Sequence, residues 1–432
     1  MRLTDDEQRM LNGEQGEVQR KLMQTLVRYG ETMDAGCLVE VEGPGHLVVL
    51  DSRRGWGARL EFLEEVAAAG LKTRFPFTMD PPGPYRVDVL DLSPSQEQAV
   101  NKRYAGEERY RELMLKLGLR DRQGTTCTPW FEQVGNRPQY GQILAWAESS
   151  AVVFINSVLG ARTHRNAGVI ELISNLVGKT PLAGLLTDDG RKADWLIEVD
   201  VSTRPDPQLL GFIVGDAVLD EVPYVTGMQP YLSSSLDQTT LQYLHDFGTN
   251  CAVGGGVGLF HIDGVTPEAR QSGQSLLRDY YKTLRIDDDM IAARQSVMIA
   301  SLPTEKITPD KCLVGCPHLT LTQLLAWSQR IDDSLSKHHS SRLAVETIMV
   351  AAPEVVAAFE ASGEPYQHFI DAGARLSSFC LEGLMQDRAI SPATVITNSN
   401  KLRHYNTGVY YFDDELLAEA MVTGVATRST SP

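Results

Sequence analysis

The segment CLVEVEGPGHLVVLDSRRGWGARLEFLEEVAAAGLK, residues 37–72, decides the fold class of this chain. Its first part, CLVEVEGPGHLVVL, is rich in the β-branched and apolar residues of strands. Its last part, ARLEFLEEVAAAGLK, has the apolar spacing of a helix that ends at Gly70. An earlier stretch, Glu14 to Met33, also places apolar residues at helical intervals. This alternation of helix and strand predicts an α/β fold.

The same alternation continues toward the C-terminus. The sequence Pro-Pro-Gly-Pro at residues 81–84 must form a loop, because neither a helix nor a central strand tolerates it. Apolar periodicity predicts helices over residues 95–117, 142–158, 169–177, 236–250, 267–285 and 319–330, and strands over 198–201, 209–214, 257–262 and 394–397.

Composition restricts the classes of partner. The 432 residues carry 40 Lys and Arg against 56 Asp and Glu, a formal net charge of −16. An acidic surface repels polyphosphate, so neither nucleic acid nor an anionic membrane is an expected partner. No apolar run approaches the ~18 residues of a spanning helix, and the N-terminus has no apolar leader core, so a cytoplasmic protein is expected. The length predicts two or three lobes, with possible lobes at 1–200 and 201–432.

Six scattered cysteines do not form the framework of a secreted disulfide protein. Cys316 follows a glycine and precedes a proline, a loop setting that recurs at iron–sulfur ligands. Cys127 has a similar loop with a proline, and Cys380 lies at the edge of a strand-like segment. A single CxxxC without a second pair argues against structural zinc. The other three, Cys37, Cys251 and Cys312, are predicted core thiols.

Two segments carry polar groups suited to a ligand. The loop 160–168, GARTHRNAG, places two arginines just before a predicted helix, which favours an anion site over a surface loop with solvated arginines. In the helix before it, Ser149 and Asn156 lie among apolar neighbours and are either satisfied core groups or a ligand-facing row. Ser399 and Lys401 follow a predicted strand, where α/β folds gather ligands, although a plain turn explains them equally well.

The glycine-rich stretch CAVGGGVG, residues 251–258, has neither the Lys-Ser/Thr of a P-loop nor a GxGxxG pattern. We therefore interpret it as close backbone packing beside a buried strand.

Several long segments together resemble the large, catalytic polypeptide of the aconitase X family. The resemblance covers nearly the whole chain, and its most specific parts are the ESSAV and NSVLGART motifs. The matching segments are residues 126–168, 258–269, 313–324 and 395–405.

The resemblance implies an aconitase-like, multi-lobe α/β/α architecture without the swivel domain that other family members carry. It also implies a hydro-lyase that removes water from a small hydroxy acid with an iron–sulfur cluster of unspecified nuclearity as Lewis acid. Carried over by position, it assigns Cys127, Cys316 and Cys380 as cluster ligands. The implied substrate-binding residues are Glu148, Ser149, Asn156, Arg162, Thr163, Arg165, Ser399, Lys401 and His46.

A small swivel-domain subunit is the implied partner. It would supply the serine that acts as general base, and we expect no room for this domain before Pro432. Family members dehydrate cis-3-hydroxy-L-proline, which we favour, or mevalonate 5-phosphate. A cluster-free, non-catalytic relative is the alternative from another class, whereas a zinc hydrolase is disfavoured because HExxH and paired CxxC motifs are missing.

Overall fold

The computed structural model describes residues 1–48, 56–85, 88–300 and 306–427. The chain folds into two compact units: unit 1 holds residues 1–80, 105–124 and 136–288, and unit 2 holds 81–104, 125–135 and 289–432. The units do not part near residue 200, as the expected lobes 1–200 and 201–432 would. Strand β5 (Ala193–Asp200) pairs with β8 (Leu277–Asp287), so a boundary at residue 200 would divide a sheet.

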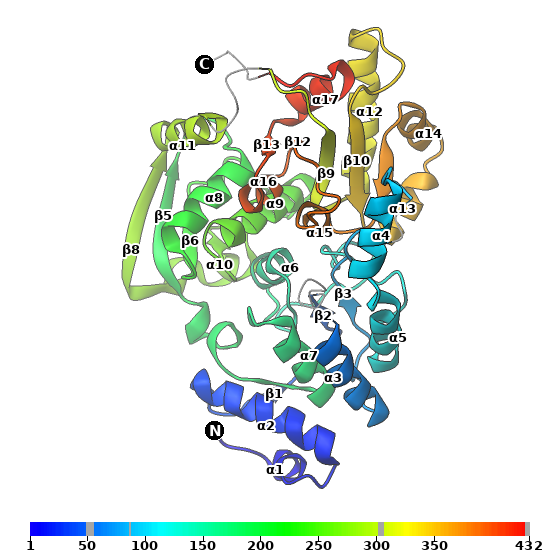
Figure 1. The fold of residues 1–432 in the computed structure, drawn as a ribbon. Coiled ribbons are helices and arrows are strands. Elements are labelled where there is room, and N and C mark those ends of the chain that lie inside the picture. Colours follow the sequence, from blue (N-terminus) through cyan, green and yellow to red (C-terminus); the bar gives the residue numbers. More distant parts are fainter. Residues whose placement is uncertain (49–55, 86–87, 301–305, 428–432) are drawn as a thin grey trace. The chain divides into compact units, whose positions relative to one another are not determined.

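Unit 1 is built around a four-stranded sheet in the order β7-β6-β5-β8, with all neighbours parallel. Helices α8 and α9 lie beside β5 and β6 (Figure 1). The other elements of the unit include two short two-stranded sheets, β1-β4 and β2-β3. Its described elements are α1 (Asp5–Leu11), α2 (Glu17–Thr32), β1 (Leu38–Glu40), β2 (His46–Leu47), α3 (Gly57–Ala68), β3 (Thr78–Met79), α5 (Glu107–Leu117), α6 (Ser149–Phe154), a π-helix (Ile155–Leu159), α7 (Gly168–Val177), β4 (Lys179–Pro181), β5, α8 (Pro207–Val218), β6 (Pro223–Thr226), α9 (Gln238–Gly254), β7 (His261–Ile262), α10 (Pro267–Ser272) and β8 (Leu277–Asp287), with 3-10 turns at Gly184–Leu186, Asp189–Arg191 and Gly273–Leu276.

Glycines bring α8 and α9 into very close contact. A Cβ atom at Gly211 would lie 2.2 Å from the carbonyl oxygen of Phe247, and one at Gly215 would lie 2.3 Å from that of Cys251. The prediction of a strand over 209–214 is wrong, because this apolar run belongs to α8. Asp206 caps that helix by accepting from the Leu209 N–H at 2.8 Å, and a proline follows the cap directly.

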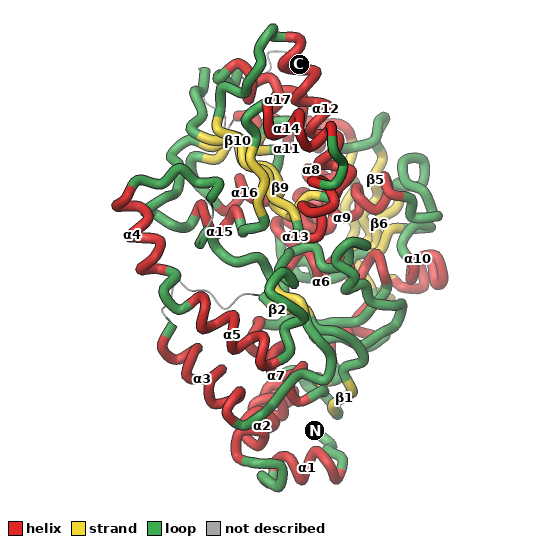
Figure 2. The backbone as a smooth tube through the Cα atoms, turned by 90° about the vertical axis from the view of Figure 1, so that its right-hand side faces the viewer, coloured by secondary structure: helices red, strands yellow, loops and turns green. Residues whose placement is uncertain are grey.

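Unit 2 contains a five-stranded parallel sheet in the order β11-β10-β9-β12-β13. Alternate residues of its central strands enter different cores, so both faces of the sheet are buried: Cys312 and Val314 of β9 join one cluster and Leu313 the other. Figure 2 shows β9 and β10 side by side near α12, α14 and α17. Its described elements are α4 (Pro94–Arg103), α11 (Asp288–Ala300, which begins at the boundary with unit 1), β9 (Lys311–Leu319), α12 (Leu321–Lys337), β10 (Glu346–Ala351), α13 (Pro353–Glu360), α14 (Glu364–Asp371), β11 (Arg375–Ser377), α15 (Leu381–Met385), β12 (Val395–Thr397), α16 (Asn400–Tyr405), β13 (Val409–Tyr411) and α17 (Asp414–Thr423).

Three predicted helices are shorter than expected. The segment 95–117 forms α4 and α5, with an interruption before Gly106, where a Cβ would lie 2.4 Å from the Trp56 ring. Residues 142–148 are not helical, because Leu144 N–H donates to Arg162 O and Arg162 N–H to Gln142 O, each at 2.9 Å. The segment 267–285 is helical only at its start, since β8 follows.

The described residues contain no helix that combines the length and apolar character needed to cross a membrane.

Candidate functional site

In unit 2, one buried histidine joins the three segments that carry the predicted cluster cysteines. His318 lies two residues after Cys316 on β9, and its backbone N–H donates to the Cys127 Sγ at 3.2 Å. Its ring Nε2 lies 3.5 Å from the carbonyl oxygen of Phe379, the residue before Cys380. The predicted ligands Cys127, Cys316 and Cys380 are all partly exposed, whereas His318 is buried. Three distant segments are thus fastened together around one imidazole.

The loop around Cys127 is held by hydroxyl groups as well. Thr126 Oγ1 lies 3.1 Å from His318 Nδ1, and the same oxygen accepts from the Thr128 N–H at 3.1 Å. Because Nε2 faces a carbonyl, it carries the ring proton, and Nδ1 accepts from the threonine. An N–H directed at sulfur favours the thiolate, which is the form that binds metals. Among the described residues, however, no group of three His, Cys, Asp or Glu side chains is placed to hold a metal ion.

The predicted core thiols differ from one another. Cys251 and Cys312 are fully buried, and burial raises the pKa of both thiols well above the usual value, which keeps them protonated. Cys37 is only partly buried.

Ser399 belongs to the same neighbourhood of unit 2 as Cys316. Its hydroxyl donates to the carbonyl oxygen of Cys316 and accepts from the Leu402 N–H at 3.1 Å, so it caps α16. The side chain is buried, and these contacts tie the end of β12 to β9. Lys401 lies in the first turn of α16 and is partly exposed.

In unit 1, Glu148 occupies a strained position at the start of α6. Its φ of +118° lies in a region that residues other than glycine rarely adopt. The carboxylate holds it there: Oε2 accepts from the Ala151 N–H at 2.6 Å, and Oε1 accepts from the hydroxyls of Ser149 and Ser150 at 3.2 and 3.1 Å. Strain of this kind persists where surrounding contacts fix it and is common at functional sites.

Asn156 lies in the π-helix that follows α6, and its side chain binds backbone rather than facing solvent. Nδ2 donates to the carbonyl oxygens of Thr163 and Gly258 at 3.0 and 2.9 Å, and Oδ1 accepts from the Thr163 N–H at 3.0 Å. Thr163 is buried as well, and its hydroxyl accepts from the Trp146 N–H at 3.0 Å. These two residues hold the turn that presents Arg162.

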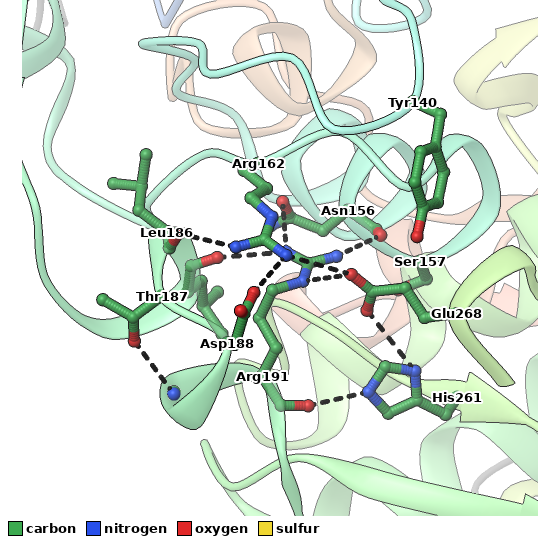
Figure 3. Close-up of polar contacts among 12 residues, drawn as sticks. Tyr140, Asn156, Ser157, Arg162, Leu186, Thr187, Asp188, Arg191, His261 and Glu268 are labelled. Atoms are coloured by element: carbon green, nitrogen blue, oxygen red, sulfur yellow. Dashed lines mark hydrogen bonds and ion pairs between the residues drawn. The ribbon is translucent and has the colours of Figure 1, made fainter. Parts of the chain in front are cut away.

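Arg162 is bound by one backbone and one side-chain oxygen (Figure 3). Its Nη1 donates to the carbonyl oxygen of Leu186 at 3.0 Å, and its Nη2 donates to Asp188 Oδ1 at 2.5 Å. Glu268 Oε1 lies farther away, 4.0 Å from Nη2.

A buried ion pair lies behind Arg162, and sequence reasoning missed it. Arg191 donates through Nε to Glu268 Oε1 at 2.7 Å, through Nη1 to Leu185 O at 3.1 Å and through Nη2 to Asn156 O at 2.8 Å.

His261 Nε2 donates to the Arg191 carbonyl at 2.8 Å, and its Nδ1 faces Glu268 Oε2 at 3.8 Å (Figure 3). Burial lowers the pKa of His261 to about 4, so the ring is neutral at neutral pH. Arg191 and Glu268 are 77 residues apart, and the sequence offers no local signal for this pairing.

Arg165 lies beside the glycine-rich stretch. A Cβ at Gly256, where φ is +102°, would lie 2.9 Å from Arg165 Nη1. The guanidinium lies 3.6 Å from Asp220, and both side chains are exposed to solvent, at 38% and 70%. A Cβ at Gly254 or Gly255 would lie 2.7 or 2.1 Å from a carbonyl oxygen of α8, so these glycines allow the α8–α9 approach, and Gly256 leaves room for the arginine side chain.

His46 is completely buried at the end of unit 1's β2-β3 pair. Its Nδ1 lies 2.9 Å from Thr78 Oγ1, and its Nε2 lies 3.2 Å from Asp80 Oδ1. Its carbonyl oxygen accepts from the Ala147 N–H at 2.8 Å, next to the strained Glu148. The structure thus brings His46, Glu148, Ser149, Asn156, Arg162 and Thr163 together through adjacent backbone segments of unit 1.

Comparisons with known proteins cover most of the chain. Residues 1–189 match the sequence model of the aconitase X first domain, and residues 193–296 match that of the aconitase X second domain. The phosphomevalonate dehydratase large subunit of Thermococcus kodakarensis is 32% identical over 327 residues, 75% of each chain. The cis-3-hydroxy-L-proline dehydratase of Pseudomonas aeruginosa is 28% identical over 417 residues, 94% of this chain and 67% of that protein. The crystal structure of Thermococcus kodakaraensis aconitase X in its holo-form superposes with a TM-score of 0.79 at 26% identity, covering 98% of this chain and all of that one.

Proposed function

This chain belongs to the aconitase X family, and on that basis we propose that it is the large subunit of a dehydratase that removes water from a small hydroxy acid. Support comes from relatives in two groups, phosphomevalonate dehydratase large subunits and cis-3-hydroxy-L-proline dehydratases, which align over two thirds or more of this chain. The mixed α/β fold with parallel sheets agrees with the aconitase X neighbour.

The proposal includes an iron–sulfur cluster held by Cys127, Cys316 and Cys380. The observation that carries it is the contact of His318 with the Cys127 sulfur and with the segment before Cys380. A cluster spreads its thiolate ligands over several irons, so its cysteines need not converge on one point as the ligands of a single ion must. When bound, such a cluster supplies a Lewis acid for the departing hydroxyl. The chain itself supplies the N–H that favours the thiolate.

In this proposal the turn at Arg162 and Thr163 binds the anionic group of the substrate. The guanidinium of Arg162 presents two N–H groups in a planar fork that matches a carboxylate or a phosphate. Asn156 and Thr163 orient that fork through the backbone. Glu148 and Ser149 follow closely after Trp146, whose N–H donates to the Thr163 hydroxyl in this turn. The carboxylate of Glu148 fixes the start of α6.

A small swivel-domain subunit is the proposed partner. Several relatives are named as large subunits, which supports a second polypeptide in the active complex. Removal of a proton next to a carboxylate requires a positioned base, and we propose that the partner supplies it.

Two substrates are candidates. We propose cis-3-hydroxy-L-proline first, since the Pseudomonas aeruginosa relative aligns over 94% of this chain. Mevalonate 5-phosphate is the second, because the relatives at 31 and 32% identity are phosphomevalonate dehydratase large subunits.

The test is anaerobic purification of the full chain with and without a co-expressed small subunit from an aconitase X relative. We expect a brown complex that contains iron and dehydrates one of the two substrates, and no dehydration by the chain alone. Cys316→Ser should remove iron and activity, whereas the control Cys37→Ser, a partly exposed cysteine of unit 1, should retain both. A colourless, iron-free and inactive wild-type complex would instead favour the cluster-free, non-catalytic relative.

A further inference from the structure

The charges around Arg162 do not balance without an exposed carboxylate. Two guanidinium groups, those of Arg162 and Arg191, face the single buried carboxylate of Glu268. That carboxylate is committed to Arg191, because its Oε1 lies 2.7 Å from Arg191 Nε but 4.0 Å from Arg162 Nη2. The neighbouring His261 adds no positive charge at neutral pH. Asp188 therefore supplies the negative charge that Arg162 needs.

Asp188 is poorly anchored for a residue in that role. Its side chain is 88% exposed, whereas that of Arg162 is 24% exposed. It is the N-cap residue of the 3-10 turn Asp189–Arg191, but its side chain makes no capping hydrogen bond to that turn. Within the described chain, Arg162 is the one partner recorded for its carboxylate. An exposed ion pair contributes little to stability, so this carboxylate is easily displaced.

Arg162 itself stays in place when Asp188 leaves. Its Nη1 is bound to the carbonyl oxygen of Leu186, which belongs to a closed turn: Thr187 Oγ1 donates to Gly184 O at 2.9 Å and accepts from the Gly190 N–H at 3.0 Å. A Cβ at Gly190 would lie 2.0 Å from the Gly184 carbonyl oxygen, so the turn is as tight as a glycine permits. The guanidinium is thus fixed on one side and exchangeable on the other.

We infer that Asp188 is a specificity-determining residue: its carboxylate competes with the anionic group of a ligand for the Nη2 edge of Arg162. The inference extends the proposed function, since it assigns Arg162 to a carboxylate or phosphate. A ligand with such a group replaces the exposed ion pair with one of its own, whereas a ligand without one leaves Arg162 paired with Asp188. This competition favours anionic ligands over neutral analogues of the same shape.

The test measures anion binding at Arg162 directly, in the full-length chain. Phenylglyoxal modifies exposed arginines, and peptide mass spectrometry reports the rate at Arg162 while inorganic phosphate or acetate protects it. We expect Asp188→Asn to raise the unprotected rate and to lower the half-protecting phosphate concentration by three-fold or more at constant ionic strength. Asp188→Ala should behave in the same way. The matched control is Asp189→Asn, which changes a neighbouring exposed carboxylate that contacts Arg278 rather than Arg162.

The inference would be overturned if wild type and Asp188→Asn had the same half-protecting phosphate concentration. It would also be overturned if phosphate protected Arg162 in neither protein. Turnover of the two candidate substrates by the complex is measured separately. If Asp188→Asn binds phosphate more tightly but the wild-type complex dehydrates neither substrate, the proposed function fails and the inference stands. If the complex is active but Asp188→Asn leaves the half-protecting phosphate concentration unchanged, the inference fails and the proposed function stands.

Discussion

Arg191 donates through Nη2 to the carbonyl oxygen of Asn156 at 2.8 Å, so a buried cation binds the backbone of the π-helix. The side chain of Asn156 in turn binds both backbone groups of Thr163. One ion pair in the interior of unit 1 therefore determines where the neighbouring Arg162 is presented.

Replacement of Arg191 by methionine should lower the free energy of unfolding by about 3–5 kcal/mol, because it leaves the Glu268 carboxylate buried without its cation. Chemical denaturation measures the loss, and hydrogen exchange of the peptide 150–165 should show local opening. The control Arg285→Met removes an exposed pair with Asp200 and should cost less than about 1 kcal/mol. Equal losses in the two variants would contradict a special role for Arg191.

Gly215→Ala should destabilise unit 1 by about 1–3 kcal/mol or more, since the added methyl lies 2.3 Å from a backbone oxygen of α9 that has nowhere to move. Thermal and urea unfolding report the change. Gly57→Ala, at the start of α3 with no atom within 4 Å of its Cβ, provides the comparison and should be neutral or stabilising by up to about 1 kcal/mol. The prediction fails if Gly215→Ala is tolerated as well as Gly57→Ala.

Glu171 on α7 should make stability fall as pH rises. Burial raises the pKa of this carboxyl well above 4.5, and the adjacent Asn166 offsets this only in part. From pH 4.5 upward the native state therefore holds a proton that the unfolded chain has lost, with a slope of up to about 1.4 kcal/mol per pH unit. Glu171→Gln should remove that slope and be more stable than wild type at pH 7, as measured by urea unfolding at several pH values. The exposed Glu360→Gln should change neither quantity.

His261 should act in the opposite direction. Its pKa in the folded protein is about 4, below the ordinary value of 6.5. The free energy of unfolding is therefore unaffected by this group above pH 6.5 and falls by about 3 kcal/mol as pH falls toward 4. His261→Gln should lose less stability over that window, because the amide stays neutral.

The surface residue His368 provides the contrast. Asp332 raises its pKa, so any stability it contributes is present at acid pH and lost as pH rises through the raised value. His368→Gln should therefore lose stability only on the acid side. Acid unfolding curves for the two variants that shift in the same direction would contradict both assignments.

The sequence predicted those helices and strands that have a clear apolar periodicity of their own. The helices α2, α7, α9 and α12 lie close to their predicted positions, because each has an apolar stripe of helical period. The strand over 209–214 was wrong, since a short apolar run fits a strand or a buried helix, and only Asp206 and Pro207 mark the helix start. Strand β8 was missed because its residues are mostly exposed and lack alternation.

Contiguous motifs allow residues of the candidate site to be proposed from the sequence, whereas contacts between distant residues cannot be predicted from it. The loop that carries Arg162 could be identified from residues 160–168 alone. The pairing of Arg191 with Glu268, and the role of His318 between Cys127 and Phe379, join residues 61 to 191 positions apart, which no local pattern encodes.

The division of the chain into two units also affects the order in which its parts can fold during synthesis. Unit 1 is complete once residue 288 has been synthesised, whereas segments 81–104 and 125–135 belong to a unit whose sheet is encoded after residue 310. During synthesis these two segments must wait for the rest of unit 2, while unit 1 can already fold. Cys127 is in the second, and its partner His318 emerges nearly two hundred residues later. The cysteine neighbourhood is therefore among the last parts of the nascent chain to assemble, and a ribosome stalled before the final third leaves it unbuilt.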